Sequence, residues 1–428
     1  MDATFLLNSL WVMISALLVI LMIGGFILLE TGSTKMKNAG HISGKTILTF
    51  GICSVVYWAV GYGLIFGEGN ALIGFSDFFY SGYDVEGLGL SGAVFFLFQT
   101  AFAAISLTIA FGGFAERAKM GVYVVFSVLF SALIYPPIAH WIWGGGWLAE
   151  HGKQDFAGST VVHLTGAMAA LAATILLKPR IGKYNKDGSA NNLYGHNQVY
   201  TALSVLLLWV GWFGFNAGST IAVDDGFFGF VAVNTNLAAA SGTIAAMIIS
   251  WVVMGKADVS MMLNGALAGL VAITASCAFV DIWASVIIGF VAGLIVFYSI
   301  RFFEDHKIDD PIYALSVHGA AGVWGTLSTG FFATPELATI GQPGLMYGGG
   351  FEQLGVQVLG VGVCGAFAFI ASFILLAIMK TVMGGLRVTE EEEIMGLDMS
   401  EHGAYGYSEL LQGETNDGPF SNRNTLKA

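Results

Sequence analysis

Two segments of the sequence, far apart along the chain, carry the same pair of ionisable residues at the same spacing. DFAGSTVVH places seven residues between Asp155 and His163, and DPIYALSVH places seven residues between Asp310 and His318. Histidine has an unperturbed pKa near 6.5, so a neutral imidazole can both donate and accept a hydrogen bond and can also pass a proton. The two histidines are therefore the first candidates for chemistry, as a pair that contacts a small polar molecule or relays a proton.

The segments around the histidines contain very few charges. Of the 428 residues, 56% are hydrophobic and 11% are charged, whereas a soluble chain carries roughly 25% charged residues. Eleven intervals hold at least 19 uncharged residues, and about 20 apolar residues are enough to cross a hydrocarbon core. The intervals begin after Asp2, Lys45, Glu86, Lys119, Asp155, Asp187, Asp225, Asp258, Asp281, Asp310 and Glu352. We predict an all-α integral membrane protein with eleven transmembrane helices, because such long apolar intervals exclude the short alternating strands of a β-barrel.

The basic residues predict the orientation of the chain in the lipid bilayer. Lys and Arg are retained on the cytoplasmic side of short loops during insertion. Sixteen of the 17 basic residues fall in alternate loops or in the C-terminal tail, and only Lys153 falls on the opposite side. With an odd number of spans, the N-terminus is predicted outside and the C-terminus in the cytoplasm, in a multi-pass protein of the cell membrane.

The repeated spacing from Asp to His predicts an internal symmetry. In the predicted topology the helix with His163 enters from outside and the helix with His318 enters from the cytoplasm, as in an inverted repeat. Each repeat would hold five helices, over about residues 8–180 and 195–335, and the eleventh helix would follow over about residues 353–381. Eight helical residues at about 1.5 Å each would place both histidines roughly 12 Å below their own membrane faces, near the midplane.

Asp155 and Asp310 precede the two helices and are candidates to cap them. A carboxylate at a helix start accepts bonds from free backbone N–H groups and complements the positive end of the helix dipole. Pro311 follows Asp310 directly and is a favoured first helical residue, so we expect this helix to begin there. An alternative role for Asp155 is to add negative potential to an outer vestibule, although capping alone explains its presence.

The predicted helices hold almost no charged side chains. Apart from Glu30 at the end of the first span, no acidic or basic side chain is expected well inside a helix. Glu30 either attracts cations at the inner end of a pathway or contacts Lys35 or Lys37 at the helix end, and we favour the second. A permanently charged ion would find no counter-charge, so the permeant is neutral or becomes neutral by losing a proton. No HExxH or CxxC spacing predicts a metal site or a cofactor, and a net charge of −12 does not support binding of nucleic acid.

Several longer motifs give the chain a family resemblance. AERAKM, IAHWIWGGGWLAEHG, DFAGSTVVH, GWFGFNAGS, DDPIYALSVHG and the tail GLRVTEEEEIMGLDMSEHGAYGY occur in order between about residues 10 and 407. In these segments the sequence resembles the ammonium transporter family (Amt/MEP/Rh), on its bacterial Amt branch. The resemblance implies a transporter of ammonium or ammonia rather than an enzyme, with methylammonium as an analogue, built as a homotrimer in which each subunit has its own pore.

The resemblance also implies roles for particular side chains. At an outer recruitment site, aromatic faces would hold the cation while a hydroxyl accepts its N–H bond, and two stacked rings below would close a pore lined by the histidines. The matched positions are Phe102, Trp143 and Ser219 for the recruitment site, Phe98 and Phe215 for the pore gate, and His163, His318 and Trp212 for the pore lining. Without the family, we would interpret the Phe and Trp side chains as packing.

The resemblance divides the chain into two parts. Residues 1–383 match the transmembrane domain, and residues 384–428 match a cytoplasmic regulatory tail, where PII-class nitrogen signalling proteins bind in this family. The chain departs from the family at Leu29 and Glu30, where a Phe-Tyr pair is frequent. Two alternatives are an Rh-type gas channel for ammonia or carbon dioxide, which the Trp143 and tail motifs disfavour, and an ammonium sensor, which the lack of an output domain disfavours.

Overall fold

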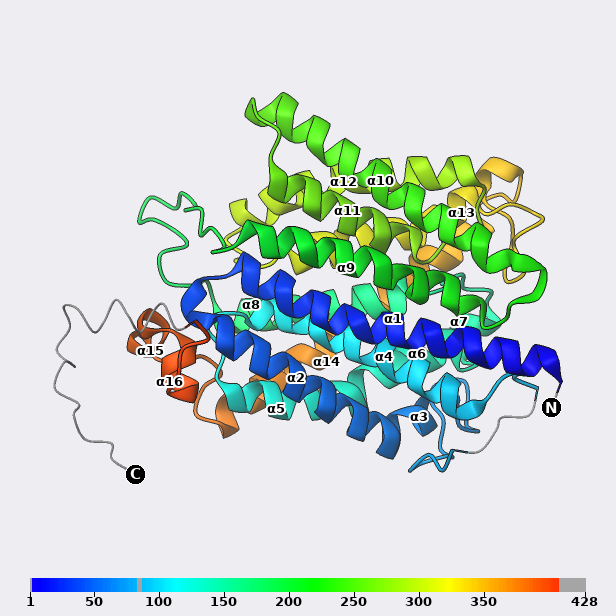
Figure 1. The fold of residues 1–428 in the computed structure, drawn as a ribbon, viewed down its shortest axis with the longest axis horizontal. Helices are drawn as coiled ribbons and strands as arrows, with labels where there is room; N and C mark the ends of the chain where they lie inside the picture. Colours follow the sequence, from blue (N-terminus) through cyan, green and yellow to red (C-terminus); the bar gives the residue numbers. More distant parts are fainter. Residues whose placement is uncertain (1, 83–86, 408–428) are drawn as a thin grey trace.

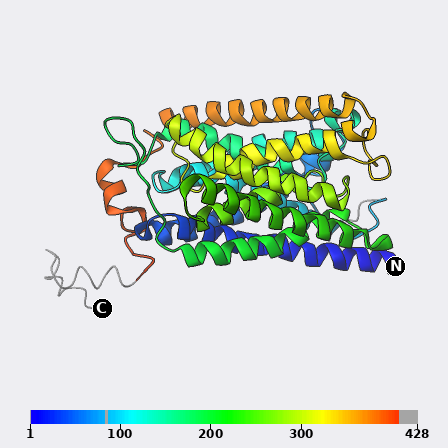
Figure 2. The same cartoon turned by 90° about the horizontal axis from the view of Figure 1, so that it is seen from above.

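The computed structural model describes residues 2–82 and 87–407, which form a bundle of long helices. Most of the helices run roughly along the longest axis of the molecule (Figure 1). Helix α1 (Ala3–Ser33) begins at one end, here called the N-terminal end, and the short helices α15 (Glu390–Met395) and α16 (Leu397–His402) lie at the other, here called the tail end. In the view from above, α1 and α9 (Gln198–Asn216) lie along one face and α14 (Glu352–Val382) lies along the opposite face (Figure 2).

Nine segments of the described chain are long and apolar enough to cross a membrane. They are Ala3–Ser33 (α1), Met36–Phe66 (containing α2, Ala39–Val56, and α3, Tyr62–Phe66), Gly92–Phe114 (containing α4, Gly92–Phe111), Met120–Glu150 (containing α5, Met120–Leu129, α6, Tyr135–Trp143, and α7, Trp147–Glu150), Ser159–Leu177 (containing α8, Thr165–Leu177), Gln198–Thr220 (containing α9), Phe227–Met254 (α10), Ile282–Asp305 (α12) and Glu352–Val382 (α14). A shorter apolar helix is α11 (Val259–Ile273), and a further helical segment consists of a π-helical turn, Leu315–Ala320, that continues into α13 (Ala321–Phe332). The predicted class, an all-helical multi-pass membrane protein, is confirmed with nine to eleven apolar helices, while the count of eleven stays a prediction.

Small residues allow the helices to approach one another closely. Gly289 on α12 faces Ala238 on α10, and a Cβ atom at Gly289 would lie 2.1 Å from the carbonyl oxygen of Ala238. Gly265 on α11 is packed as tightly, because its Cβ would lie 2.5 Å from the carbonyl oxygen of Gly242 on α10. Helices in lipid gain little from the hydrophobic effect when they associate, so such backbone contacts are a main source of their packing energy.

An ion pair joins the first two long segments inside the bundle. Glu30 lies on α1 and Lys45 on α2, neither side chain has exposed surface, and Lys45 Nζ lies 2.7 Å from a carboxylate oxygen of Glu30. The same Nζ lies 5.4 Å from the ring centroid of Phe111 and 5.5 Å from that of Tyr123. The lysine charge is thus compensated by a carboxylate and by two aromatic faces, and the pair as a whole adds no net charge to the bundle.

This ion pair corrects the expected partners of Glu30, which were Lys35 and Lys37. Helix α2 begins at Ala39, so Lys45 lies more than one turn inside the helix, whereas the charge pattern placed it in a loop. The chain reverses direction between α1 and α2, and this antiparallel arrangement sets Lys45 opposite Glu30. The expectation that no basic side chain lies inside a helix is wrong for the same reason.

A second group of charges lies at the tail end, outside the apolar segments. Arg180 forms an ion pair with Glu116 and a second with Asp309, which has a carboxylate oxygen 2.8 Å from Arg180 Nη2. Arg117 lies 4.0 Å from the other oxygen of Asp309. Burial alone would raise the pKa of Asp309, but the hydrogen bonds and charge of Arg180, with the charge of Arg117, hold that pKa well below its usual range. The group therefore ties three interhelical loops together.

The described part of the tail packs on this end of the bundle. Thr389 and Glu392 form a capping box that starts α15, as the sequence TEEE favours. On α16, Asp398 accepts the backbone N–H of Gly40 at 3.0 Å and that of His41 at 2.7 Å. These two donors belong to the first turn of α2, so the tail supplies the cap for a membrane helix. Residues 408–428 of the predicted tail lie outside the described residues.

The ion pair between Glu30 and Lys45 predicts a specific stability pattern. Lys45→Met leaves a buried carboxylate without its partner, and we expect a loss of about 3–5 kcal/mol in unfolding free energy. The double variant Glu30→Gln with Lys45→Met carries no charge at this place and should recover most of the loss. Thermal unfolding in detergent micelles measures both effects, and a double variant no more stable than Lys45→Met contradicts the prediction.

Candidate functional site

The two histidines of the repeated motif lie side by side in the interior of the bundle. His163 belongs to a π-helical turn, Ser159–Leu164, that continues into α8, and His318 belongs to the π-helical turn that continues into α13. Their Nδ1 atoms lie 3.2 Å apart, and the ring planes differ by 18° with centroids 5.2 Å apart. His163 is fully buried and His318 is 3% exposed. The geometry allows one imidazole to donate a hydrogen bond to the other.

Each aspartate of the motif holds the start of the turn that carries its histidine. Asp155 Oδ2 accepts the backbone N–H of Thr160 at 3.0 Å and that of Val161 at 2.9 Å. Asp310 accepts the corresponding bonds from Ala314 at 3.0 Å and Leu315 at 2.6 Å. The two carboxylates therefore bind free N–H groups four to six residues further along the chain, at the first helical residues.

The aspartates are nevertheless not the first residues of their helices. The π-helical turns begin at Ser159 and Leu315, and residues 156–158 and 311–313 after the aspartates are not helical. The prediction that the helix begins at Pro311 is therefore wrong, because Tyr313 has a positive φ of 60°, which no helix start accommodates. The depth of about 12 Å calculated for the histidines fails with it, since it assumed a helical rise from the aspartate onwards.

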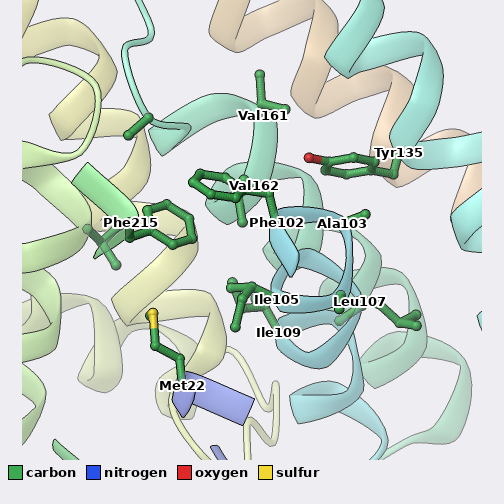
Figure 3. Close-up of a cluster of buried hydrophobic side chains, with 14 of the residues drawn as sticks. Met22, Phe102, Ala103, Ile105, Leu107, Ile109, Tyr135, Val161, Val162 and Phe215 are labelled. Atoms are coloured by element: carbon green, nitrogen blue, oxygen red, sulfur yellow. The ribbon is translucent and has the colours of Figure 1, made fainter. Parts of the chain in front are cut away.

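A column of aromatic rings leads to the histidine pair. Phe102 on α4 stacks on Phe215 of α9, with centroids 4.1 Å apart and planes 24° apart. The ring centroid of Phe215 lies 5.6 Å from that of His163. Trp212 also stacks on His163, with ring centroids 5.3 Å apart. Figure 3 shows Phe102 and Phe215 facing one another, with Val162 beside them. All these rings are buried, so a molecule that reaches the histidines along this column must separate them.

The stacked pair differs from the one predicted. The family resemblance matched Phe98 with Phe215, whereas the ring that lies against Phe215 is Phe102. Phe98 lies four residues earlier on α4 and contacts Phe102 edge to face at 4.7 Å. A Cβ atom at Gly218 would lie 3.3 Å from Phe98, which places this ring next to Gly218, the residue before Ser219. Residues one helical turn apart share a face of the helix, so the motif FQTAF by itself does not distinguish their partners.

The remaining residues of the predicted recruitment site lie around the outer part of this column. The indole N–H of Trp143 donates to the carbonyl oxygen of Asp155 at 2.8 Å, and its ring contacts Phe102 edge to face at 5.9 Å. The hydroxyl of Ser219 donates to the carbonyl oxygen of Phe215 at 2.7 Å, and its oxygen keeps acceptor capacity. Both side chains are partly exposed. Two aromatic faces and a hydroxyl acceptor are groups that bind a small cation with N–H bonds.

Three residues near the histidines were not predicted from the sequence. The ring of Phe26 on α1 lies 6.1 Å from that of His318, and the hydroxyl of Thr274 accepts the indole N–H of Trp212 at 2.8 Å. Lys153 lies close behind the turn of His163 and is buried. Thr274 could have been found as an isolated polar residue within an apolar run. Lys153 could have been found because it is the one basic residue that falls in a loop on the opposite side from the others. In the described residues, no cluster of three His, Cys, Asp or Glu side chains is placed to hold a metal ion.

Comparisons with known proteins agree with one another. The sequence profile of the Ammonium Transporter Family matches residues 10–407. The chain is similar to ammonium transporter Amt2 of Archaeoglobus fulgidus, with 43% identity over 424 residues that cover 95% of this chain and 89% of the relative. It is 37% identical to the ammonium transporter of Bacillus subtilis over 419 residues, which cover 94% of this chain and 99% of the relative.

Solved structures show the same similarity. The structure titled Sensor Amt Protein superposes with a TM-score of 0.88 at 40% identity, over 93% of this chain and 99% of that chain. Mep2 of Candida albicans superposes with a TM-score of 0.85 at 31% identity, over 91% of this chain and 87% of that chain. The bundle described above is therefore the fold of Amt and Mep proteins along most of its length.

The cap at Asp310 predicts a pH dependence of stability. Burial raises the pKa of Asp310 to about 6, although the N–H bonds from Leu315 and Ala314 oppose this shift. A folded-state pKa above the unfolded value of about 4 means that the contribution of this carboxyl is fully present below pH 4 and is lost as the pH rises to 6. Asp310→Asn cannot ionise and lacks this dependence.

The difference in Tm between the wild type and Asp310→Asn should therefore decrease between pH 4 and pH 7. Thermal unfolding in buffered detergent at several pH values measures it. A difference that stays constant across this range would show that Asp310 has an ordinary pKa in the folded protein.

Proposed function

Since the chain belongs to the ammonium transporter family, as a non-enzymatic transporter of ammonium across a membrane, we propose a route in which ammonium is recruited, deprotonated and conducted as ammonia. Ammonium binds at an outer aromatic site, loses one proton before the stacked rings, and crosses as neutral ammonia past the two histidines. The observation that carries the proposal is the buried histidine pair, with Nδ1 atoms 3.2 Å apart, at the inner end of an aromatic column.

We infer the finer architecture from the same family membership. Nine long segments, α11 and the segment ending with α13 together make eleven spans, and the two π-helical turns with histidines are the equivalent parts of a five-plus-five inverted repeat. The N-terminal end is the outer side and the tail end the cytoplasmic side, in line with the basic residues. Three copies form the homotrimer, each with its own pore, in the cell membrane.

The recruitment site uses Trp143, Ser219 and the aromatic rings of α4. Cation–π attraction to two rings is worth about 1–2 kcal/mol when the cation is partly desolvated, and the Ser219 oxygen accepts one N–H of the bound ammonium. Because Phe98 lies next to Gly218, the residue before Ser219, while Phe102 stacks on Phe215, we assign Phe98 to the recruitment site and Phe102 to the gate. Phe102 also borders Trp143.

Loss of a proton follows from the properties of the column. The rings of Phe102 and Phe215 offer neither hydrogen bonds nor a counter-charge, and moving an ionised ammonium into such surroundings costs several kcal/mol. The buried ion pair of Glu30 and Lys45 does not compensate this cost, because the two side chains neutralise each other. Neutral ammonia avoids this cost and is small enough to pass when the rings separate.

The histidines then supply hydrogen bonds in an otherwise apolar passage. Their Nδ1 atoms share one proton between them, so each ring keeps a fixed orientation. His163 Nε2 is buried and has no hydrogen-bond partner among the described residues, so it is available to ammonia. The titration of two rings this close belongs to the pair, and the same pair offers a route for the released proton.

The cytoplasmic side provides a surface for regulation. The tail helices cap α2 through Asp398, and the hydroxyl of Tyr407 lies 3.1 Å from His196 Nε2. A partner that moves the tail therefore acts directly on the ends of membrane helices. We propose a cytoplasmic PII-class signalling protein as that partner, in line with the family resemblance of residues 384–428.

Substitution of the histidines tests the conduction route. In proteoliposomes given an ammonium jump, His163→Ala and His318→Ala should each lower the transport current by about tenfold or more, or change how the current depends on pH. A tenfold decrease corresponds to the loss of about one buried hydrogen-bond partner. Solid-supported membrane electrophysiology measures both quantities. Currents, selectivity and pH response that match the wild type in both variants would remove the histidines from the mechanism, and a wild type without current would favour a sensor.

Substitution of Trp143 tests recruitment separately. Trp143→Leu removes one aromatic face and the bond to Asp155, so the half-saturating ammonium concentration should rise by about 5–30-fold, the equivalent of about 1–2 kcal/mol. Trp283→Leu serves as control, since Trp283 lies on α12 and is 45% exposed. An unchanged half-saturation in Trp143→Leu contradicts the assignment.

A further inference from the structure

Lys153 is the one basic residue that the charge pattern leaves on the outer side, and the structure buries it. Its exposed fraction is 2%. Its Nζ donates to the carbonyl oxygen of Gln154 at 3.2 Å and to the hydroxyl of Thr160 at 3.1 Å. Thr160 is fully buried and lies three residues before His163 on the same π-helical turn. A lysine at this place loses hydration, and neither recruitment nor conduction as described above uses it.

The neighbouring helices are shaped around the lysine. A Cβ atom at Gly360 on α14 would lie 2.2 Å from Lys153 Cε, so the stem of the lysine occupies the space that a larger residue would fill. The hydroxyl of Thr160 also bonds the hydroxyl of Thr326 on α13 at 2.7 Å, which holds Thr160 in place, and it accepts the lysine bond because an ammonium group can only donate. The π-helical turn with Thr160, α13 and α14 therefore form a defined binding position for the Lys153 ammonium group.

The lysine and Asp155 lie on either side of one residue. Thr160 gives its backbone N–H to Asp155 Oδ2 at 3.0 Å and accepts the Lys153 bond on its hydroxyl. Lys153 and Asp155 are not among the direct ion pairs of the described residues, so the two charges are close without touching. The loop with Lys153 and Asp155 also fixes the position of Trp143 on α6, because the indole N–H of Trp143 donates to the carbonyl oxygen of Asp155 at 2.8 Å. A buried anion and a buried cation thus stand directly behind the recruitment site.

We propose that Lys153 offsets the charge of Asp155 and thereby sets how weakly the outer site holds ammonium. The inference rests on the proposed recruitment site at Trp143. A buried carboxylate alone would attract ammonium over several ångströms in a medium of reduced dielectric, and a tightly held cation would leave the site slowly. The fixed positive charge of Lys153 cancels much of that attraction, so the site releases ammonium towards the gate. Lys153 acts on the substrate through the electric field and not by contact.

Lys153→Met tests this role because it removes the charge and keeps an unbranched stem of similar length. In proteoliposomes containing the full chain, the half-saturating ammonium concentration should fall by about three- to tenfold, and the maximal current should fall with it, as expected for charges several ångströms apart. Lys178→Met is the matched control, since Lys178 is exposed in a loop on the opposite side and its loss changes the net charge equally. A merely structural role for Lys153 would lower the maximal current and leave half-saturation unchanged.

Gly360→Ala provides a second, independent test. The added methyl group displaces Lys153 Cε and separates Nζ from Thr160 while the charge stays in the protein, so half-saturation should fall in the same direction and to a smaller extent. If the wild type transports and neither variant that reaches the membrane changes half-saturation, the inference is wrong and the proposed function stands. If the wild type shows no saturable current, the proposed function itself fails.

Discussion

The cost of an uncompensated charge in hydrocarbon determines how this molecule is built. Several buried charged groups have specific partners: Glu30 has Lys45, Asp310 has the N–H groups of a helix start, and the buried arginines at the tail end have carboxylates. The passage between these groups contains rings and two imidazoles. A cation that cannot shed its charge pays the full desolvation cost there, whereas ammonium can leave a proton behind. In the proposed route, selectivity for ammonium follows from this difference in desolvation cost.

The sequence alone was sufficient for the fold class and for the centre of the site. Charge-free intervals report membrane segments directly, because an isolated charge in lipid is expensive wherever it lies. The repeated spacing from Asp155 to His163 and from Asp310 to His318 is also informative, because capping is an interaction between residues that are close in the chain. The pairing of the two histidines followed from topology, as two short segments entering from opposite sides.

The errors share one physical origin, which is contact between residues that are distant or ambiguous in sequence. Glu30 was assigned to nearby lysines, while its partner Lys45 is presented by a second helix that runs back along the first. Phe98 and Phe102 lie on one face of α4, so only the position of α9 decides which of them stacks on Phe215. The helix starts after Asp155 and Asp310 were placed too early, because a carboxylate can cap N–H groups several residues onward when a non-helical loop bridges the gap. Local propensity contains none of this information.

The two ends of the passage have matching caps and different charges. At one end Asp155 is accompanied by Lys153, and in the proposed mechanism the local field on an approaching cation is therefore weak and aromatic faces hold the ammonium. At the inner end Asp310 follows Asp309, whose charge is used by Arg180, and burial with this neighbouring carboxylate keeps the pKa of Asp310 near 6. The proposed recruitment site adjoins only the Asp155 end, so in the proposed route saturation by ammonium depends on that end of the passage.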